Sequence, residues 1–364
     1  MITLPFVLEW LRAGHLYLFQ NITVRATLAA ITAFAICLLC GPAVIRWLQS
    51  AQIREKVEKG DSAQLARMHE KKKGTPTQGG LLISGAMLAS VLVWGRLDNG
   101  FVAISFLVIL FSGAIGWLDD RIKLLDPTKK GLNKTEKLIL QFLCYGIVSA
   151  ALWILQDPVR PPTLSLPFLK LEIAMGQMLY VAWGAFALAL ASNAVNLTDG
   201  LDGLAAGCSV MTGLALSAVV YVAGRSDFTR YLAIPYVPGV GELAVVGAAM
   251  VGASLGFLWF NCFPAEVFMG NTGSLVLGGT IGYLALAARQ ELVLLLLGAV
   301  FMAEIASVVL QVASFRLLGK RIFRIAPIHH HFEFGGWHEA KVTVRFWILA
   351  AILAMAMLLT LKTR

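Results

Sequence analysis

Ten runs of apolar residues, each roughly 20 residues long, divide the chain. A helix needs about 20 such residues to cross a bilayer, where only helices and closed barrels satisfy their backbone hydrogen bonds. Charged residues make up 14% of the sequence, against about 25% in a soluble domain, which excludes a soluble enzyme. We therefore expect an all-α integral membrane protein in which residues 1–364 form one domain of about ten transmembrane helices. The expected helices are 24–45, 77–95, 100–118, 136–155, 173–191, 203–223, 243–260, 272–288, 291–315 and 343–361.

Basic residues predict the orientation of these helices. The segments 46–75, 119–137 and 316–345 hold 20 of the 30 Lys and Arg residues. Because cytoplasmic loops collect Lys and Arg, we expect these segments in the cytoplasm and both termini in the periplasm. This bias and the attraction to anionic membrane lipids account for the net charge of +9, so no nucleic acid partner is expected.

Three segments outside the apolar runs have a character of their own. Residues 1–23 mix a few charges into apolar sequence, which predicts an interfacial helix. Residues 157–171, with four prolines, predict a periplasmic hairpin. Residues 316–342 are expected to form a cytoplasmic loop rich in histidine.

Two acidic residues stand together at the end of the third predicted helix. Asp119 and Asp120 are adjacent in the segment GWLDDRIK (116–123). Adjacent carboxylates repel each other unless they share a cation or a proton, which favours a functional site. A solvated helix end beside Arg121 and Lys123 is the alternative, and the residues alone leave both interpretations open.

A second polar segment, SNAVNLTDGLDGLAAG (192–207), joins the fifth and sixth predicted helices and contains no Lys or Arg. Asp199 and Asp202 would share one face of a helix, and Gly200 would let the backbone approach a ligand closely. Asn and Asp side chains without basic partners suit a magnesium or nucleotide site. The simpler interpretation is an Asx-rich turn with helix caps. The four residues concerned are Asn193, Asn196, Asp199 and Asp202.

The segment FLWFNCFPAEVFMGNTGSLVLGG (257–279) contains Asn261 and a Gly-Asn-Thr-Gly-Ser turn at 270–274. Such a turn at the start of a helix can cradle phosphate with its backbone N–H groups. In KKKGTPTQGG (71–80), the lysines are typical of a membrane surface and Pro76 predicts the first turn of a helix.

Three adjacent histidines stand in RIFRIAPIHHHFEFGGWHE (321–339). The spacing of a helical zinc motif is absent, so a phosphate clamp formed with Arg321 and Arg324 fits better. Together, these polar segments predict one cytoplasmic site for metal-assisted phosphoryl transfer to a lipid-soluble acceptor.

The motifs GTPTQGG, LDD, SNAVNLTDGLDG, PAEVFMG and APIHHHFEFGGWHE, in this order, resemble those of the phospho-N-acetylmuramoyl-pentapeptide transferases. These enzymes are a branch of the polyprenyl-phosphate N-acetylhexosamine-1-phosphate transferases, and the His-rich form of the last motif separates them from relatives that use UDP-GlcNAc. The resemblance implies transfer of phospho-MurNAc-pentapeptide from UDP-MurNAc-pentapeptide to undecaprenyl phosphate, which gives lipid I and UMP. It also implies Mg²⁺ as cofactor, a homodimer, and a place in the bacterial plasma (inner) membrane.

The resemblance assigns roles to particular residues. It implies that Asp119 is the base that deprotonates the lipid phosphate, that Asp120, Asn271, His329 and His330 are also catalytic, and that Asp119, Asp120 and Asn271 hold the metal. The substrate-binding residues that it implies are Lys73, Thr75, Asn193, Asn196, Asp199, Gly200, Asp202, Asn261, Phe268, Gly270, Gln311 and His331.

Two positions depart from the family pattern. Gln78 stands where Met is usual, and Asn271 stands where the family has an Asp that binds magnesium. An amide oxygen can coordinate a hard cation but brings no charge, so activity is expected to be reduced or abolished. A covalent route that used a carboxylate nucleophile at position 271 would be closed, so turnover of this chain would favour direct attack.

Three other functions fit parts of the pattern. The chain could be a UDP-GlcNAc-type transferase, which the intact APIHHHFE segment disfavours, or a catalytically inactive variant that binds substrate or inhibitor, which Asn271 favours. A transporter or channel would show inverted repeats and broken helices at mid-membrane, whereas these carboxylates cluster at the predicted cytoplasmic ends.

Overall fold

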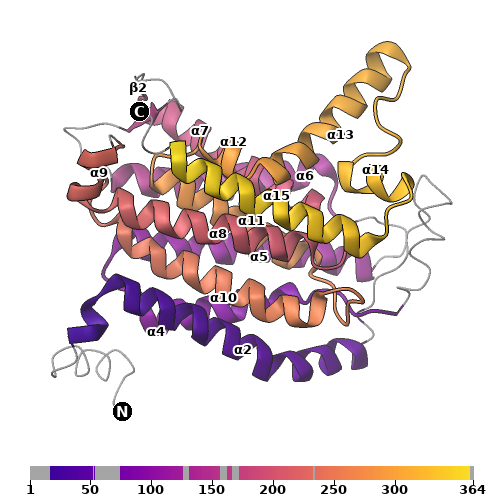
Figure 1. The fold of residues 1–364 in the computed structure, drawn as a ribbon, viewed down its shortest axis with the longest axis horizontal. Helices are drawn as coiled ribbons and strands as arrows, with labels where there is room; N and C mark the ends of the chain where they lie inside the picture. The colour runs from indigo at the N-terminus through magenta and orange to yellow at the C-terminus, as the bar shows by residue number, and fades with distance from the viewer. Residues whose placement is uncertain are drawn as a thin grey trace.

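Long helices run side by side in a single bundle (Figure 1). The structure is a computed structural model that describes residues 17–51, 53, 74–125, 131–155, 162–165, 172–232 and 234–360. The principal helices are α2 (Ile22–Ser50), α4 (Gly80–Trp94), α5 (Gly100–Leu125), α6 (Lys134–Ile154), α7 (Gln177–Thr198), α8 (Leu204–Ala223), α10 (Leu243–Asn261), α11 (Gly270–Ala287), α13 (Ala299–Leu318) and α15 (Glu339–Thr360). The shorter elements are η1 (Tyr17–Gln20), α9 (Ser226–Leu232), η3 (Val240–Glu242), α12 (Leu294–Leu297) and α14 (Ile328–Phe334).

Within these described ranges, eight helices are long and apolar enough to cross a membrane. The protein is therefore a helical, multi-pass membrane protein, as the composition predicts. Two of the ten predicted transmembrane helices are not among these eight. Helix α4 has only 15 residues, and α11 begins with the polar residues 270–274. The figure of ten crossings, and the side on which the termini lie, stay predictions.

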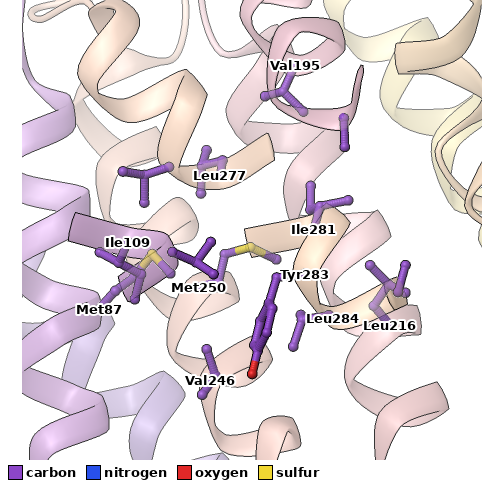
Figure 2. Packing of buried hydrophobic residues seen from close by; sticks show 14 of the residues in the cluster. Met87, Ile109, Val195, Leu216, Val246, Met250, Leu277, Ile281, Tyr283 and Leu284 are labelled. Atoms are coloured by element: carbon purple, nitrogen blue, oxygen red, sulfur yellow. The ribbon is translucent and has the colours of Figure 1, made fainter. Parts of the chain in front are cut away.

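Helix α11 forms the centre of the bundle. Sixteen of its 18 residues are buried, and Figure 2 shows Leu277 and Ile281 of this helix among side chains from its neighbours. The surrounding residues include Met87 of α4, Ile109 of α5 and Met250 of α10. A helix without a lipid-facing side has no need of a uniformly apolar sequence, so α11 can carry polar residues at its start.

Small and polar residues hold the helices around α11 together. The hydroxyls of Ser112 (α5), Tyr145 (α6) and Ser192 (α7) form a buried chain with links of 2.9 and 3.0 Å, and Ser192 donates to the carbonyl of Leu275 in α11. An added Cβ at Gly278 would overlap the backbone of α7. Interhelical hydrogen bonds and close backbone approach are the usual means of helix association in a membrane.

Several boundaries differ from the sequence prediction. Helix α5 continues beyond 118 to Leu125, so the paired aspartates lie inside it. Pro76 does not begin a helix, because α4 starts only at Gly80. The ninth predicted helix is interrupted at Gly298, between α12 and α13, and the segment 316–342 contains α14 instead of a continuous loop.

Segments expected outside the helices are described only in part. Strands β1 (Thr163–Ser165) and β2 (Glu172–Ala174) pair antiparallel, a small exception to an all-α fold. Most of the predicted hairpin 157–171 and residues 1–16 of the predicted interfacial helix lie outside the described residues. Figure 1 shows that α13 leaves the bundle at an angle, with α14 beside it at the same end of the molecule.

Candidate active site

The paired aspartates lie where α5 meets the start of α11. Asp119 and Asp120 are 3% and 6% exposed, so neither is a solvated helix end. One turn earlier, Gly116 packs so closely on α11 that an added Cβ would overlap the backbone of Asn271. Helix packing therefore brings the LDD segment against the Gly-Asn-Thr-Gly-Ser segment, 150 residues away in the sequence.

Asp120 caps the N-terminus of α11. One carboxylate oxygen accepts the N–H of Asn271 at 3.1 Å, and the other accepts the N–H and the hydroxyl of Thr272 at 3.0 and 2.9 Å. The first N–H groups of a helix lack partners within the helix, and the helix dipole favours an anion there. The backbone N–H groups expected to cradle phosphate at 271 and 272 are thus already bound to a carboxylate of the protein.

Asp119 is surrounded by donors. Its Oδ1 accepts the backbone N–H of Leu132 at 2.7 Å, and the ammonium of Lys123 lies 3.4 Å from its Oδ2. The same Oδ2 accepts a hydrogen bond from the side-chain amide of Asn271. The amide nitrogen of Asn271 must face Asp119, because an ionised carboxylate can only accept.

A chain of amides continues from Asn271 into α7. Asn196 donates to Oδ1 of Asn271 at 2.6 Å and to the hydroxyl of Ser274 at 2.8 Å. Its own Oδ1 accepts from the ammonium of Lys137 in α6, at 3.1 Å. Lys137, Asn196, Asn271 and Asp119 therefore form one connected polar group drawn from four helices.

Asn193, one turn before Asn196, serves as a link between helices. Its amide donates to Oε1 of Gln141 in α6 at 2.7 Å and to the carbonyl of Ala189 at 2.8 Å. The bond to Gln141 holds α7 against α6 and thereby orients the turn that carries Asn196, whereas the bond to Ala189 lies within α7.

The segment 199–203 is a turn between α7 and α8, so Asp199 and Asp202 do not share a helical face. Oδ2 of Asp202 accepts the N–H of Ala265 at 3.0 Å. Asn261 accepts the N–H of Gly203 at 3.1 Å and donates to the carbonyl of Val267 at 2.8 Å. Both side chains thus fasten this turn to the segment 261–267, whereas Asp199 and Gly200 are half-buried.

The segment 76–80 lies along the segment 268–269. The N–H of Phe268 donates to the carbonyl of Pro76 at 2.8 Å, and the N–H of Gly79 returns a bond to Phe268 at 2.9 Å. The structure therefore joins GTPTQGG to PAEVFMG beside the aspartates. Thr75, Phe268 and Gly270 are half-buried, and Lys73 lies outside the described residues.

All three histidines fall in α14, a helix of seven residues. His329 is fully buried, whereas His330 and His331 are half-buried. Nδ1 of His330 lies 2.6 Å from Oε2 of Glu333, and burial lowers the pKa of His330 although Glu333 acts in the opposite direction. Nδ1 of His331 accepts the N–H of Arg324 at 3.1 Å, so its proton sits on Nε2 when the ring is neutral.

Gln311 of α13 holds the segment that leads to α14. Its Oε1 accepts the N–H groups of Ile322 and Phe323 at 3.1 and 2.9 Å, and its nitrogen donates to the carbonyl of Phe323 at 2.9 Å. The guanidinium of Arg324 donates to the carbonyl of Phe334, and that of Arg321 lies over the ring of Phe315. Both arginines of the predicted phosphate clamp thus make contacts within this region, each guanidinium keeps further N–H donors, and the clamp stays a prediction.

Several residues of the site were not predicted from the sequence. In the sequence, Lys137 is one of several basic residues in a predicted cytoplasmic segment. Nothing in the sequence pattern singles out Gln141, Ser274 or Glu339. The carboxylate of Glu339 accepts the N–H of Asp202 at 2.8 Å, which attaches the start of α15 to the turn. Glu304 carried a signal, since an acidic residue inside an apolar run is expensive and needs a reason.

The arrangement defines the class of protein: a multi-pass membrane protein with a cluster of buried carboxylates and half-buried amides and lysine at one end of its bundle. A family model described as glycosyl transferase family 4 matches residues 102–289, more than half of the chain. The protein belongs to this family, and it is a sugar-phosphate transferase of the kind that acts on polyprenyl phosphates. The matched region contains Asp119, Asn196 and Asn271 but ends before α14.

Proposed function

We propose that the protein transfers phospho-MurNAc-pentapeptide from UDP-MurNAc-pentapeptide to undecaprenyl phosphate, and so forms lipid I and UMP in the bacterial inner membrane. The observation that carries this choice within the family is the packing of the His-rich segment 326–339 against the turn 199–203. His329 lies against Gly200, and Glu339 is bonded to Asp202. The motif that resembles the muramoyl-pentapeptide branch thus lies against one of the polar segments from which we propose that the site is formed.

The residues around the start of α11 offer oxygen atoms, which are the ligand type that a hard divalent cation prefers. No cluster of three or more His, Cys, Asp and Glu residues that could hold a metal occurs in the described part of the chain. Asp119 and Asn271 nevertheless offer a carboxylate and an amide side by side, and the oxygens of both groups are ligands that Mg²⁺ accepts. In the structure the amide nitrogen of Asn271 faces Asp119, so the amide would have to turn to present its oxygen to the ion. We propose that these two hold Mg²⁺ when it is bound, and that Asp120 supports them from its place as the cap of α11. Bound Mg²⁺ would neutralise the charge of the diphosphate.

We assign the base that takes the proton of the lipid phosphate to Asp119. Asp120 is the weaker candidate, because both of its oxygens are held by backbone N–H groups at the start of α11. Among the described residues, Oδ2 of Asp119 is contacted only by the side chains of Asn271 and Lys123, which can move aside for a substrate. Lys123 and Lys137 supply positive charge beside these carboxylates, which favours anionic substrates. The half-buried Asn196, Asp199, Phe268 and Gly270 are the proposed contacts of the nucleotide.

Asn271 fits direct attack by the lipid phosphate on the sugar diphosphate. An amide cannot serve as the carboxylate nucleophile of a covalent route. A second candidate function is binding without turnover, and it is favoured by the hydrogen bond between Asn271 and Asp119, which gives that carboxylate a partner without a metal ion.

The test is a transfer assay in detergent or proteoliposomes with undecaprenyl phosphate, with and without Mg²⁺. UDP-MurNAc-pentapeptide and UDP-GlcNAc are offered separately, and lipid product and UMP are both quantified. We expect magnesium-dependent product from the first donor alone. Product from UDP-GlcNAc alone would overturn the proposal, and saturable binding of UDP-MurNAc-pentapeptide without UMP release would establish the binding variant. We also propose that the protein is a homodimer, as the family resemblance implies, and light scattering of the same sample tests this.

A further inference from the structure

A buried acid–histidine pair connects α13 to α14. Glu304 of α13 and His329 of α14 are both 0% exposed. Oε2 of Glu304 lies 3.1 Å from Nδ1 of His329 and accepts the backbone N–H of the same residue at 3.4 Å. The backbone hydrogen bond holds the first turn of α14, and the carboxylate lies against the ring although Nδ1 itself has no hydrogen-bond partner in the described part of the chain.

Charge explains why this pair stays together. An ionised carboxylate buried without a partner costs several kcal/mol, and its attraction to a nearby imidazolium or N–H offsets that cost. Glu304 is the only acidic residue of α13, and Oε1 has no hydrogen-bond partner among the described residues. Breaking the contact with His329 would therefore leave the carboxylate uncompensated.

The other side of the His329 ring is covered by the turn between α7 and α8. An added Cβ at Gly200 would overlap Nε2 of His329. This nitrogen has no hydrogen-bond partner in the described part of the chain. A ring that is enclosed by Glu304 on one edge and by Gly200 on the other is not placed to touch a substrate.

The neighbouring histidines depend on this anchor. The ring of His330 lies 4.1 Å from that of His329, centroid to centroid. His330 and His331 follow directly on the same short helix, and both are partly exposed. A shift of His329 would therefore move both of them relative to the turn 199–203.

We propose that Glu304 is a positioning residue, whose buried carboxylate holds His329 against Gly200 and thereby sets the place of His330 and His331 in the site. His329 is then the anchor of α14, and His330 and His331 are the histidines that meet the substrate. This inference rests on the proposed function only where enzyme activity is measured. The contact between α13 and α14 can be followed by hydrogen exchange, which needs no turnover.

The experiment compares the full-length parent with Glu304→Gln, His329→Asn and the double variant. Glu304→Gln keeps an acceptor for the backbone N–H of His329 but loses the charge. Ser307→Ala is the matched control, because Ser307 is buried on α13 one turn further on and its hydroxyl bonds only to the carbonyl of Glu304. Hydrogen exchange of the amides 328–334 and the KM and kcat of lipid I formation are measured for each protein.

We expect faster exchange over 328–334 and a KM for UDP-MurNAc-pentapeptide raised roughly tenfold in both single variants, since small displacements of binding groups cost this much. The double variant should be no worse than either single one, and Glu304→Asp should recover part of the loss. Ser307→Ala should match the parent.

Two results would overturn the inference. One is parental exchange and kinetics in Glu304→Gln while His329→Asn loses kcat, which would make His329 itself a catalytic residue. The other is a double variant whose losses are the product of the single ones. If no protein, the parent included, uses UDP-MurNAc-pentapeptide, the proposed function fails, and the exchange data still decide whether Glu304 holds α14.

Discussion

Helix α11 and the pair α13–α14 both carry residues of the proposed site, but α11 is enclosed by other helices and α13–α14 is largely exposed. Sixteen of the 18 residues of α11 are buried, whereas most of α13 is exposed beyond Ser307 and its side chains at 309, 310, 315, 317 and 318 are large and apolar. Asn271 is held by helices on every side. The histidines are held by a few side chains, chiefly Glu304 and Gln311.

The two regions therefore hold their site residues in place in different ways. The carboxylate–amide cluster is assembled by helix packing, so it should be rigid and sensitive to any change of charge. The His-rich segment is attached by single polar contacts, so it should respond to the loss of one contact with local loosening and little change in global stability. The predictions that follow test this contrast, from the largest expected effect to the smallest.

The variants Asp119→Asn and Asp120→Asn should distinguish the proposed base, Asp119, from the residue that caps α11, Asp120. In an Asn271→Asp background, Asp119→Asn should lower the rate of lipid I formation at least about 100-fold, as expected for loss of a general base. It should cost less stability than Asp120→Asn, because it also removes the repulsion between the two carboxylates at 119 and 271. Asp120→Asn should lower the unfolding free energy by roughly 1 kcal/mol, because an amide replaces a charged cap. Initial rates and thermal unfolding in detergent measure both. Equal losses of stability in the two variants would contradict the division of roles.

Asn271→Asp should raise lipid I formation at least about tenfold, which corresponds to roughly 1.4 kcal/mol of barrier. The new carboxylate faces Asp119, so the pair requires a shared cation, and the gain should depend on Mg²⁺ concentration. Ser274→Ala is a control at the same helix start that leaves the charge unchanged. Equal rates for parent and Asn271→Asp across a magnesium titration would remove the metal role of position 271.

Gln311→Ala should loosen the α13–α14 region without unfolding the bundle. Three hydrogen bonds to 322–323 are lost, and kcat/KM should fall roughly fivefold, or about 1 kcal/mol. Hydrogen exchange over 320–326 should increase while the unfolding temperature stays near that of the parent. Ser314→Ala, which removes one exposed bond to the carbonyl of Lys320, should have a smaller effect. A large fall in unfolding temperature would show that this region is part of the cooperative core.

Acid should weaken the same region slightly. Burial lowers the pKa of His330 below its ordinary value, and the neighbouring His329 lowers it further. Glu333 and Glu304 act in the opposite direction and do not cancel the effect of burial. The unfolded chain therefore binds more protons, and stability falls as the pH falls below about 6.5. His330→Gln should reduce the loss in unfolding temperature between about pH 7.5 and about pH 5.5. An unchanged pH dependence in His330→Gln would refute this account.

Apolar periodicity predicted the fold well because the bilayer demands long apolar helices and allows few alternatives. Helix ends were predicted poorly where polar residues continue a helix, as at Asp119 and Asp120, or where Pro76 precedes an extended segment. The site residues were recognised as types, but their partners were not. Nothing in the sequence indicates that Asp120 caps a helix 150 residues later, or that Asn261 fastens a turn. Such contacts depend on the packing of helices, which a linear pattern does not contain.

The burial of α11 has a consequence for how this protein is made. Helices α2, α4, α5, α7, α8 and α10 all precede α11 in the chain, so during synthesis its neighbours are already available when it emerges. A segment that begins Gly-Asn-Thr-Gly-Ser can then enter a space lined by protein and need not partition into lipid by itself. The order of the helices along the chain thus allows a membrane enzyme to keep a polar helix start at the heart of the bundle.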